Sequence, residues 1–260
     1  MMYLTVRIHC RNAILRYSSR RIRHTTQNTE SERIMCGRYT LYSEIKAIED
    51  QFDVEINDEE LVRPDYNATP GTLRPVVLVR GTNDRVACKL KWGLVPPFVK
   101  DLSDWKPLIN ARSETVNEKP SFRKAFHRKR CIVPANGFYE WKDFGGDKKI
   151  PFYIRLLDQD LFGMAGIYET HADSDGSKLH TFAVLTTKAN SLMQPLHERM
   201  PVILRRDDYN VWLNPVQPRP EMLQSLLTPY PTESMSTYKV STEVNNVRNN
   251  GPGLINPKLK

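Results

Sequence analysis

Apolar residues in this 260-residue chain recur in short runs bounded by turn-forming residues, a pattern typical of a mainly antiparallel β-sheet. In one such run, residues 86–92, the side chains of Val86, Cys88, Leu90 and Trp92 fall on every second position. This alternation predicts a strand with one buried face. The other predicted strands cover residues 76–80, 131–134, 152–156, 162–167, 181–186 and 202–204.

Apolar spacings of three and four residues predict a small number of helices among these strands. Ile45, Ile48 and Phe52 would share the buried face of a helix for which Ser43 is the expected N-cap. Residues 61–75 combine prolines with polar side chains and predict an ordered loop. Further helices are expected at residues 119–128, 208–213 and 221–227. Because helices and strands alternate without a regular βαβ order, the predicted fold class is α+β.

The length is sufficient to bury a sizeable core, and we expect one large domain. No apolar run approaches the roughly 18 residues of a membrane span, which predicts a soluble protein with no membrane partner. Cys10, Cys36, Cys88 and Cys131 lack the C-x-x-C spacing of zinc sites, and we interpret Cys88 and Cys131 as core residues. The sequence has no P-loop or dinucleotide fingerprint, so neither a cofactor nor a metal is expected.

Positive charge is concentrated in two parts of the sequence. The formal net charge is +8, and residues 1–35 carry +5 of it. Residues 112–130 also carry a net +5 and are interpreted as a nucleic-acid contact, although a solvated helix face would give the same pattern.

Residues 1–35 are interpreted as an N-terminal extension, and the sequence leaves three interpretations of it open. Translation starts at Met35 and the extension is a misassigned start, which suits a cytoplasmic or nucleoid protein, or a nuclear one in a eukaryote. The extension, rich in Arg, Ser and Thr, is alternatively a cleaved mitochondrial transit peptide. In the third interpretation it is retained.

Residues 35–39, Met-Cys-Gly-Arg-Tyr, read like the start of a mature protein, because a methionine before a small residue can be removed. If Cys36 becomes the first residue, its α-amine and thiol form a 1,2-aminothiol. Such a group captures an aldehyde as an imine, and its sulfur then closes a thiazolidine ring. An internal cysteine cannot carry out this reaction.

Six short motifs follow one another along the chain. They are Met-Cys-Gly-Arg-Tyr at 35–39, Tyr-Asn-Ala-Thr-Pro at 66–70, Trp-Gly-Leu-Val-Pro at 92–96, Asn-Ala-Arg-Ser-Glu at 110–114, Gly-Phe-Tyr-Glu-Trp at 137–141 and His-Glu-Arg-Met-Pro at 197–201. With these motifs in this order, the chain resembles the SRAP family, the SOS response-associated peptidases. The resemblance extends from Cys36 to an asparagine-rich segment at residues 244–250.

The resemblance implies a fold and a function. It implies one SRAP domain over residues 36–260, with mainly antiparallel sheets in a barrel-like arrangement and a few flanking helices. Members of the family crosslink covalently to abasic sites in single-stranded DNA through an N-terminal cysteine, which shields the lesion. The resemblance also implies self-removal of the initiator methionine and a lyase activity. The expected protein is a monomer whose partner is single-stranded DNA containing abasic sites, with replication-fork proteins as further partners.

Capture of a sugar aldehyde requires groups that transfer protons and orient the sugar. Aromatic neighbours would exclude water from the carboxylate of Glu140, and the resemblance implies that Glu140 is the catalytic carboxylate. His197 can donate a proton to the sugar oxygen and recover it near neutral pH. The resemblance implies that it is the family's active-site histidine. Asn110 would orient the amine or the opened sugar with an amide that does not titrate.

DNA contacts are expected from basic and aromatic residues near these positions. Arg112 and Arg199 each follow a predicted catalytic residue by two positions, so on extended segments they would point to the same side and hold phosphates. Arg38 lies close to Cys36 in sequence and is expected to contact DNA as well.

Stacking surfaces for bases are expected from Trp92 and Trp141, because single-stranded DNA sites combine aromatic platforms with a basic groove. The resemblance alone implies that Asn67 and Pro70 belong to a loop that interrupts base stacking beside the lesion.

Two other function classes compete with this interpretation. An N-terminal-nucleophile cysteine amidohydrolase would use Cys36 to attack an amide, but it would not need the basic segment 112–130. A non-covalent reader of modified or single-stranded nucleic acid would not need Cys36 as a free terminus.

Overall fold

The computed structural model describes residues 37–81, 84–103, 105–145, 149–172, 176–216 and 219–258. The chain divides into two units, Met1–Ile34 and Met35–Lys260, and every described element belongs to the second. Cys10 and Cys36 lie outside the described residues.

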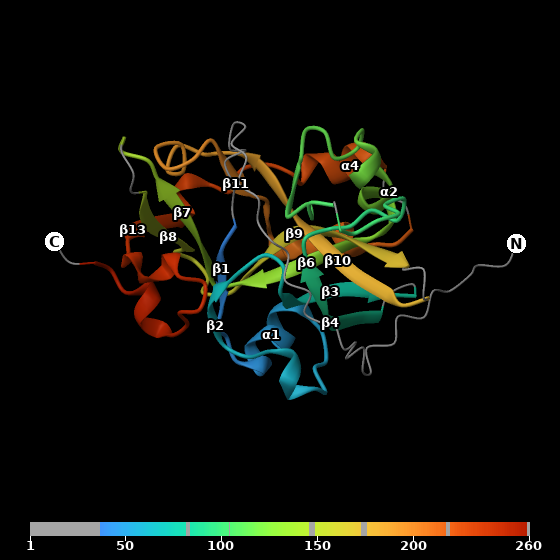
Figure 1. The fold of residues 1–260 in the computed structure, drawn as a ribbon, viewed down its shortest axis with the longest axis horizontal. Coiled ribbons are helices and arrows are strands. Elements are labelled where there is room, and N and C mark those ends of the chain that lie inside the picture. The colour runs from blue at the N-terminus through green and yellow to red at the C-terminus, as the bar shows by residue number, and fades with distance from the viewer. Residues whose placement is uncertain are drawn as a thin grey trace, which may run out of the picture. The chain divides into compact units, whose positions relative to one another are not determined.

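Five strands close into a barrel, which the family resemblance predicted and which Figure 1 shows on the side of β3, β9 and β10. The strands are β3 (Leu73–Arg80), β4 (Asp84–Trp92), β6 (Arg130–Ala135), β9 (Phe162–Ala172) and β10 (Lys178–Lys188). Each strand of the ring β10–β4–β3–β6–β9 pairs with the next, and β9 pairs with β10 to close it. The β10–β4 pairing is parallel and the other four are antiparallel. The predicted α+β class, with mainly antiparallel sheets, is confirmed.

Three short strands extend this sheet. β5 (Asn110–Arg112) lies parallel to β10, β11 (Arg199–Pro201) lies antiparallel to β10, and β12 (Ile203–Leu204) pairs with β9. The strand predicted at residues 202–204 is observed as β12, and β11 is a further strand directly before it. Val202 links the two barrel strands β10 and β9. Its backbone N–H donates to the carbonyl of Leu185 in β10, and its carbonyl accepts from the N–H of Ala165 in β9.

A second sheet has the strand order β13–β8–β7–β1–β2. Its strands are β1 (Tyr39–Leu41), β2 (Asp65–Ala68), β7 (Gly137–Lys142), β8 (Ile150–Leu156) and β13 (Met235–Lys239). All of its pairings are antiparallel. A short link at Asn136 connects β6 of the barrel to β7, so one continuous chain segment contributes a strand to each sheet.

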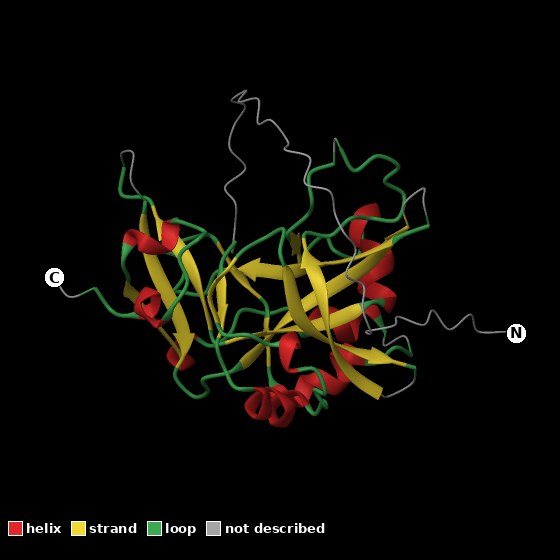
Figure 2. Ribbon diagram, turned by 60° about the horizontal axis from the view of Figure 1, so that its bottom comes forward, coloured by secondary structure: helices red, strands yellow, loops and turns green. Residues whose placement is uncertain are grey.

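Helices flank the strands, as Figure 2 shows in red. They are α1 (Ile45–Phe52), α2 (Pro120–Arg128), α3 (Tyr209–Leu213) and α4 (Pro220–Ser225). Five 3₁₀ turns complete the described elements: η1 (Glu59–Leu61), η2 (Arg206–Asp208), η3 (Thr232–Ser234), η4 (Thr242–Asn245) and η5 (Pro252–Ile255). Among the described residues, none of these helices combines the length and apolar character that a membrane crossing requires.

The helices cover the barrel because their apolar faces have the helical period. In α2, the side chains of Phe122, Ala125 and Phe126 are buried, and the helix packs on β6 and β9. Close packing is possible where β9 carries glycine: a Cβ at Gly163 would lie 2.9 Å from the hydroxyl of Tyr209 in α3. Cys88 and Cys131 are both buried, which confirms their interpretation as core residues.

Two local expectations were wrong. Helix α1 forms with Ile48 and Phe52 buried, but its N-cap is Glu44 rather than Ser43. The reason is that the amide of Asn136 donates to the Ser43 hydroxyl at 2.7 Å, which removes that side chain from the helix end. Residues 61–75 are also not only a loop, since they contain β2 and the start of β3. Pairing with β1 makes a strand of a sequence with little β propensity of its own.

Candidate functional site

Strand β7 places Glu140 beside the start of β1. In the antiparallel register Tyr39 lies opposite Phe138, and the same register carried two residues on brings Gly37 alongside Glu140. Tyr139 N–H donates to the carbonyl of Arg38 at 3.0 Å, which continues the pairing up to that point. Glu140 is 2 % exposed. A buried carboxylate therefore lies next to the residue that is bonded to Cys36.

A second group of predicted residues lies along the C-terminal half of β10. Asn110 lies opposite Val184 and Arg112 lies opposite Thr186, so both side chains fall on one face of β5. Asn110 is half-buried, whereas Arg112 is exposed. On the other side of β10, Arg199 pairs with Lys188. The strand with Asn110 and Arg112 and the strand with Arg199 thus flank the same end of β10 from opposite sides.

His197 lies just before β11 and is held by backbone hydrogen bonds. Its own N–H donates to the carbonyl of Met193 at 2.9 Å, and its ring Nδ1 accepts the N–H of Arg199 at 3.0 Å. Because Nδ1 accepts this hydrogen bond, the neutral imidazole carries its proton on Nε2. His197 can therefore donate a hydrogen bond from Nε2.

Arg199 does not present a solvent-facing guanidinium, contrary to the expectation of a phosphate clamp. Its side chain is 8 % exposed and donates to both carboxylate oxygens of Glu114, at 2.7 and 2.8 Å. It also donates to the carbonyl of Thr186 at 2.6 Å. The bidentate pair holds the pKa of the Glu114 carboxyl below its ordinary value, although burial acts in the opposite direction. Arg199 therefore ties the turn after β5 to β10.

Part of the basic segment 112–130 is also internal. Arg130 is buried, where it donates to three backbone carbonyls, and Lys129 forms an ion pair with a buried glutamate of β9. Arg123, Lys124 and Arg128 of α2 are exposed. The basic surface is consequently smaller than the segment's net charge suggested.

Arg38 and Asn67 form a hydrogen-bonded network in which Asn67 is buried and Arg38 is half-buried. Asn67 is 3 % exposed, and its Oδ1 accepts from Arg38 Nη1 at 2.6 Å. The same Nη1 donates to the carbonyl of Val244 at 2.7 Å. The expected contact between Asn67 and DNA is therefore wrong, because the amide is enclosed by protein. Pro70 is half-buried and is followed by a tight turn at Gly71, where φ is +83°.

The two predicted tryptophans differ in accessibility. Trp92 is 1 % exposed, lies against Tyr39 and Phe182, and donates from Nε1 to the carbonyl of Ile109 at 2.9 Å. The expected stacking of Trp92 on a base is therefore wrong, since the alternation that buries its strand face buries the indole too. Trp141 is half-buried, and the Arg38 guanidinium lies 5.7 Å from its ring centroid.

An aromatic pair with one exposed member, Phe98, and one half-buried member, Trp105, was not predicted. Phe98 is 56 % exposed and meets Trp105 edge to face, with ring centroids 6.4 Å apart. Both lie in a loop whose ends are joined by two backbone hydrogen bonds between Leu94 and Leu108, just before β5. The signal in the sequence was Phe98, an aromatic residue directly after two prolines. Prolines disfavour a central strand and so indicate a loop.

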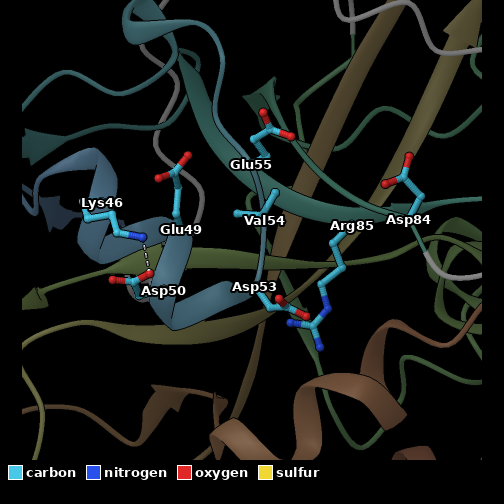
Figure 3. A pocket seen from close by; sticks show the side chains of 8 residues that line it. All are labelled: Lys46, Glu49, Asp50, Asp53, Val54, Glu55, Asp84 and Arg85. Atoms are coloured by element: carbon cyan, nitrogen blue, oxygen red, sulfur yellow. Dashed lines mark hydrogen bonds and ion pairs between the residues drawn. The ribbon is translucent and has the colours of Figure 1, made fainter.

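A polar concavity lies elsewhere, around α1 and the start of β4, and Figure 3 shows it from close by. It contains none of the predicted site residues. Its lining is dominated by carboxylates, which would repel phosphates: Lys46, Glu49, Asp50, Asp53, Val54, Glu55, Asp84 and Arg85. Within the described part of the chain, no group of acidic, histidine and cysteine side chains is arranged to hold a metal ion.

Comparison with known proteins gives this arrangement a family. The model of the family described as SOS response associated peptidase (SRAP) matches residues 35–247. The chain is 46% identical over 222 residues to the abasic site processing protein YoqW of Bacillus subtilis, covering 85% of this chain and 99% of YoqW. It is 31% identical over 226 residues to the abasic site processing protein HMCES of Xenopus tropicalis, covering 75% of this chain and 66% of HMCES. A crystal structure of a Bacteroides thetaiotaomicron protein superposes with a TM-score of 0.78 at 29% identity, over 86% of this chain and 100% of that protein. The chain belongs to the SRAP family.

Proposed function

We propose that this protein processes abasic sites in single-stranded DNA by forming a covalent crosslink through Cys36. The observation that carries the proposal is the position of the buried Glu140 carboxylate, in register with Gly37 and therefore beside the residue bonded to Cys36. The relatives YoqW and HMCES are named abasic site processing proteins, which supports abasic sites as the substrate. Release of Met35, by the protein itself or by another peptidase, is required first, because only a terminal Cys36 has a free α-amine.

The chemistry proceeds in two bond-forming steps. The opened sugar of an abasic site presents an aldehyde at C1′, which the Cys36 amine attacks to give a carbinolamine. Loss of one water leaves an imine, and addition of the thiol across the C=N bond closes the thiazolidine while a proton passes to nitrogen. The net change is one water released per adduct. If the imine persists without ring closure, loss of the proton next to it permits strand cleavage, which is the lyase branch.

Three side chains are assigned to proton transfer and orientation. Glu140 accepts and returns protons beside the amine, in a buried place where water does not compete. His197 offers a hydrogen bond from Nε2–H to the ring oxygen of the sugar and so stabilises the opened form, because its Nδ1 accepts the backbone N–H of Arg199. Asn110 orients the amine or the opened sugar with its amide from the edge strand β5.

The DNA backbone is assigned to the exposed cations. Arg112 lies on the same strand face as Asn110, and Arg123, Lys124 and Arg128 of α2 extend the positive surface. Stacking of bases is assigned to aromatic side chains that reach the surface, namely the half-buried Trp141 and the pair formed by the exposed Phe98 and the half-buried Trp105.

The test compares three forms of the protein by intact mass after incubation with an abasic single-stranded oligonucleotide. A chain that begins at Met35 should lose this methionine and then gain the mass of the oligonucleotide minus one water. The full 260-residue chain with its extension retained should gain nothing. A Cys36→Ser chain should form only an imine, which appears after borohydride reduction and disappears without it.

Other outcomes identify other functions. An equal adduct in the extended chain would exclude the aminothiol and point to the thiol alone. DNA binding without any adduct would identify a non-covalent reader, and amide hydrolysis without DNA binding would identify an amidohydrolase.

A further inference from the structure

The C-terminal segment, defined as residues 244–250, is bound to the strand that leads to Cys36 by one buried amide. Asn67 donates from Nδ2 toward the carbonyls of Val244, Asn246 and Asn249, at 3.3, 3.1 and 2.9 Å. Its Oδ1 accepts from Arg38, whose side chain has no acceptor, so the orientation of the amide is fixed. One side chain thus holds both the C-terminal segment and Arg38.

Arg38 receives a second contact from the same segment. Its Nη1 donates to the Val244 carbonyl at 2.7 Å, and its guanidinium packs over Trp141, which itself donates to Asn245 Oδ1 at 2.7 Å. Among the described residues, these partners of Arg38 are neutral oxygens and an aromatic ring rather than a carboxylate. Burial accordingly lowers the pKa of Arg38 below its ordinary value.

The segment is anchored by packing as well as by hydrogen bonds. Val244 is buried in a small core with Tyr139 and Tyr153 of the sheet that carries Glu140. Asn249 Nδ2 donates to the Glu243 carbonyl at 2.9 Å, which closes the segment on itself. These contacts give the segment one conformation next to β7.

Only Gly37 separates Arg38 from Cys36, and glycine has no side chain with which to anchor the chain. Arg38 is therefore the side chain closest in sequence to Cys36 that the described structure anchors. Misplacement of a reacting group by about 1 Å is enough to slow a reaction substantially.

We propose that Asn67 is a positioning residue for Cys36, and that it acts by binding the C-terminal segment and Arg38 at the same time. This inference rests on the proposed function, because it concerns the same nucleophile. The C-terminal segment is then a part of the reactive site even though it supplies no reacting atom.

The test uses Asn67→Asp in the chain that begins at Met35. Aspartate keeps the oxygen that accepts from Arg38, but it replaces the donor with an oxygen that faces three carbonyls and repels them. The matched control is Val247→Ser, which changes an exposed side chain of the same segment. Adduct formation is timed at saturating abasic DNA. The dissociation constant is measured separately on a tetrahydrofuran analogue that has no aldehyde.

We expect Asn67→Asp to lower the maximal rate of adduct formation about 10-fold or more. The dissociation constant should stay within about twofold of the control, and the final yield of adduct should be unchanged. A merely structural role would instead lower rate and yield together, in proportion to the folded fraction. Reaction of Cys36 with a small free aldehyde is a second measurement, and it should not slow, because that aldehyde needs no alignment with Glu140.

Two results would overturn the inference. The first is a folded Asn67→Asp protein whose maximal rate lies within twofold of Val247→Ser, and the second is a yield that falls in step with the rate. Should Asn67→Asp fail to fold, Asn67→Ser replaces it under the same criteria, since a hydroxyl keeps one of the four hydrogen bonds. Failure of the unmodified protein to form any adduct would instead refute the proposed function, whatever the variants do.

Discussion

Arg38 and Arg112 lie in two regions of one protein that treat a positive charge in opposite ways. Arg38 is half-buried, and its contacts are a buried amide, a backbone carbonyl and an indole ring. Arg112 is exposed at the edge of the barrel sheet, and the described residues offer it no ion pair. The first arrangement fixes the position of the guanidinium through neutral partners. The second leaves the charge available but fixes little.

The difference follows from what each region is proposed to do. A nucleophile and its proton carrier need a defined separation, so their strands β1 and β7 are held by buried hydrogen bonds. Phosphates along a flexible strand need only a positive surface, which attracts them over several ångströms and weakens as salt is added. Arg199 resembles Arg38 in this respect, although it is close in sequence to a predicted catalytic residue. Its guanidinium already donates to both carboxylate oxygens of Glu114.

The largest effect is expected from Glu140→Gln, which tests the buried region. The amide keeps the shape of the carboxylate but cannot take up a proton, so adduct formation should slow by roughly 10² or more. Binding to the tetrahydrofuran analogue should not change. Timed denaturing gels measure the rate. A Glu140→Gln protein that reacts at the normal rate would leave Glu140 with no part in proton transfer.

A smaller effect, on the free energy of unfolding, is expected where the buried region is packed closely around Gly137 of β7. In Gly137→Ala, the new Cβ would meet the Tyr153 hydroxyl and lie 2.7 Å from the Ile154 carbonyl oxygen, neither of which can move freely inside the sheet. We expect the free energy of unfolding to fall by about 1–3 kcal/mol, measured by urea denaturation. Gly253→Ala is the control, because its Cβ would have no atom within 4 Å. Equal stabilities would show that β7 can shift to admit a side chain.

A smaller effect is expected at the exposed region. Arg112→Ala should weaken binding of single-stranded DNA a few-fold, and the slope of log affinity against log salt should fall by about one. Lys46→Ala is the matched control, since it removes a positive charge from the acidic concavity of Figure 3. Fluorescence anisotropy at several salt concentrations gives both slopes. Identical slopes would remove Arg112 from the interface.

The smallest effect concerns the ion pair between Glu114 and Arg199. The pKa of Glu114 is lower in the folded state than its ordinary value of 4.5, so the folded protein binds fewer protons there than the unfolded chain does. The pair therefore contributes fully above pH 4.5, and its contribution is lost as the pH falls through the folded pKa. Glu114→Gln should cost under about 1 kcal/mol at pH 7, because the carboxylate is partly exposed. Urea midpoints measured against pH should converge in acid, and a constant difference would contradict this origin.

The sequence predicted the barrel strands and the four helices well because their apolar periods are regular. It did not predict β1, β5 or β13, since three to five residues carry too little pattern and take their conformation from the neighbouring strand. For the site, it predicted the same-face placement of Asn110 and Arg112, which follows from strand alternation alone. It could not predict that Trp92 and Asn67 are enclosed or that Arg199 is paired. Those properties depend on partners at distant positions, such as Val244 for Asn67 and Glu114 for Arg199.

The hydrogen bond between Arg38 and Val244 joins residues 206 positions apart, and this has a consequence for protein synthesis. At about 5–20 residues per second, a ribosome needs roughly 10–40 s to reach Val244 after it has made Arg38. Arg38 therefore leaves the ribosome long before the segment that holds it exists. On the proposed mechanism, the nascent chain would have its aminothiol during this interval but not its aligned site, so we expect full reactivity toward an abasic site only when translation is nearly finished.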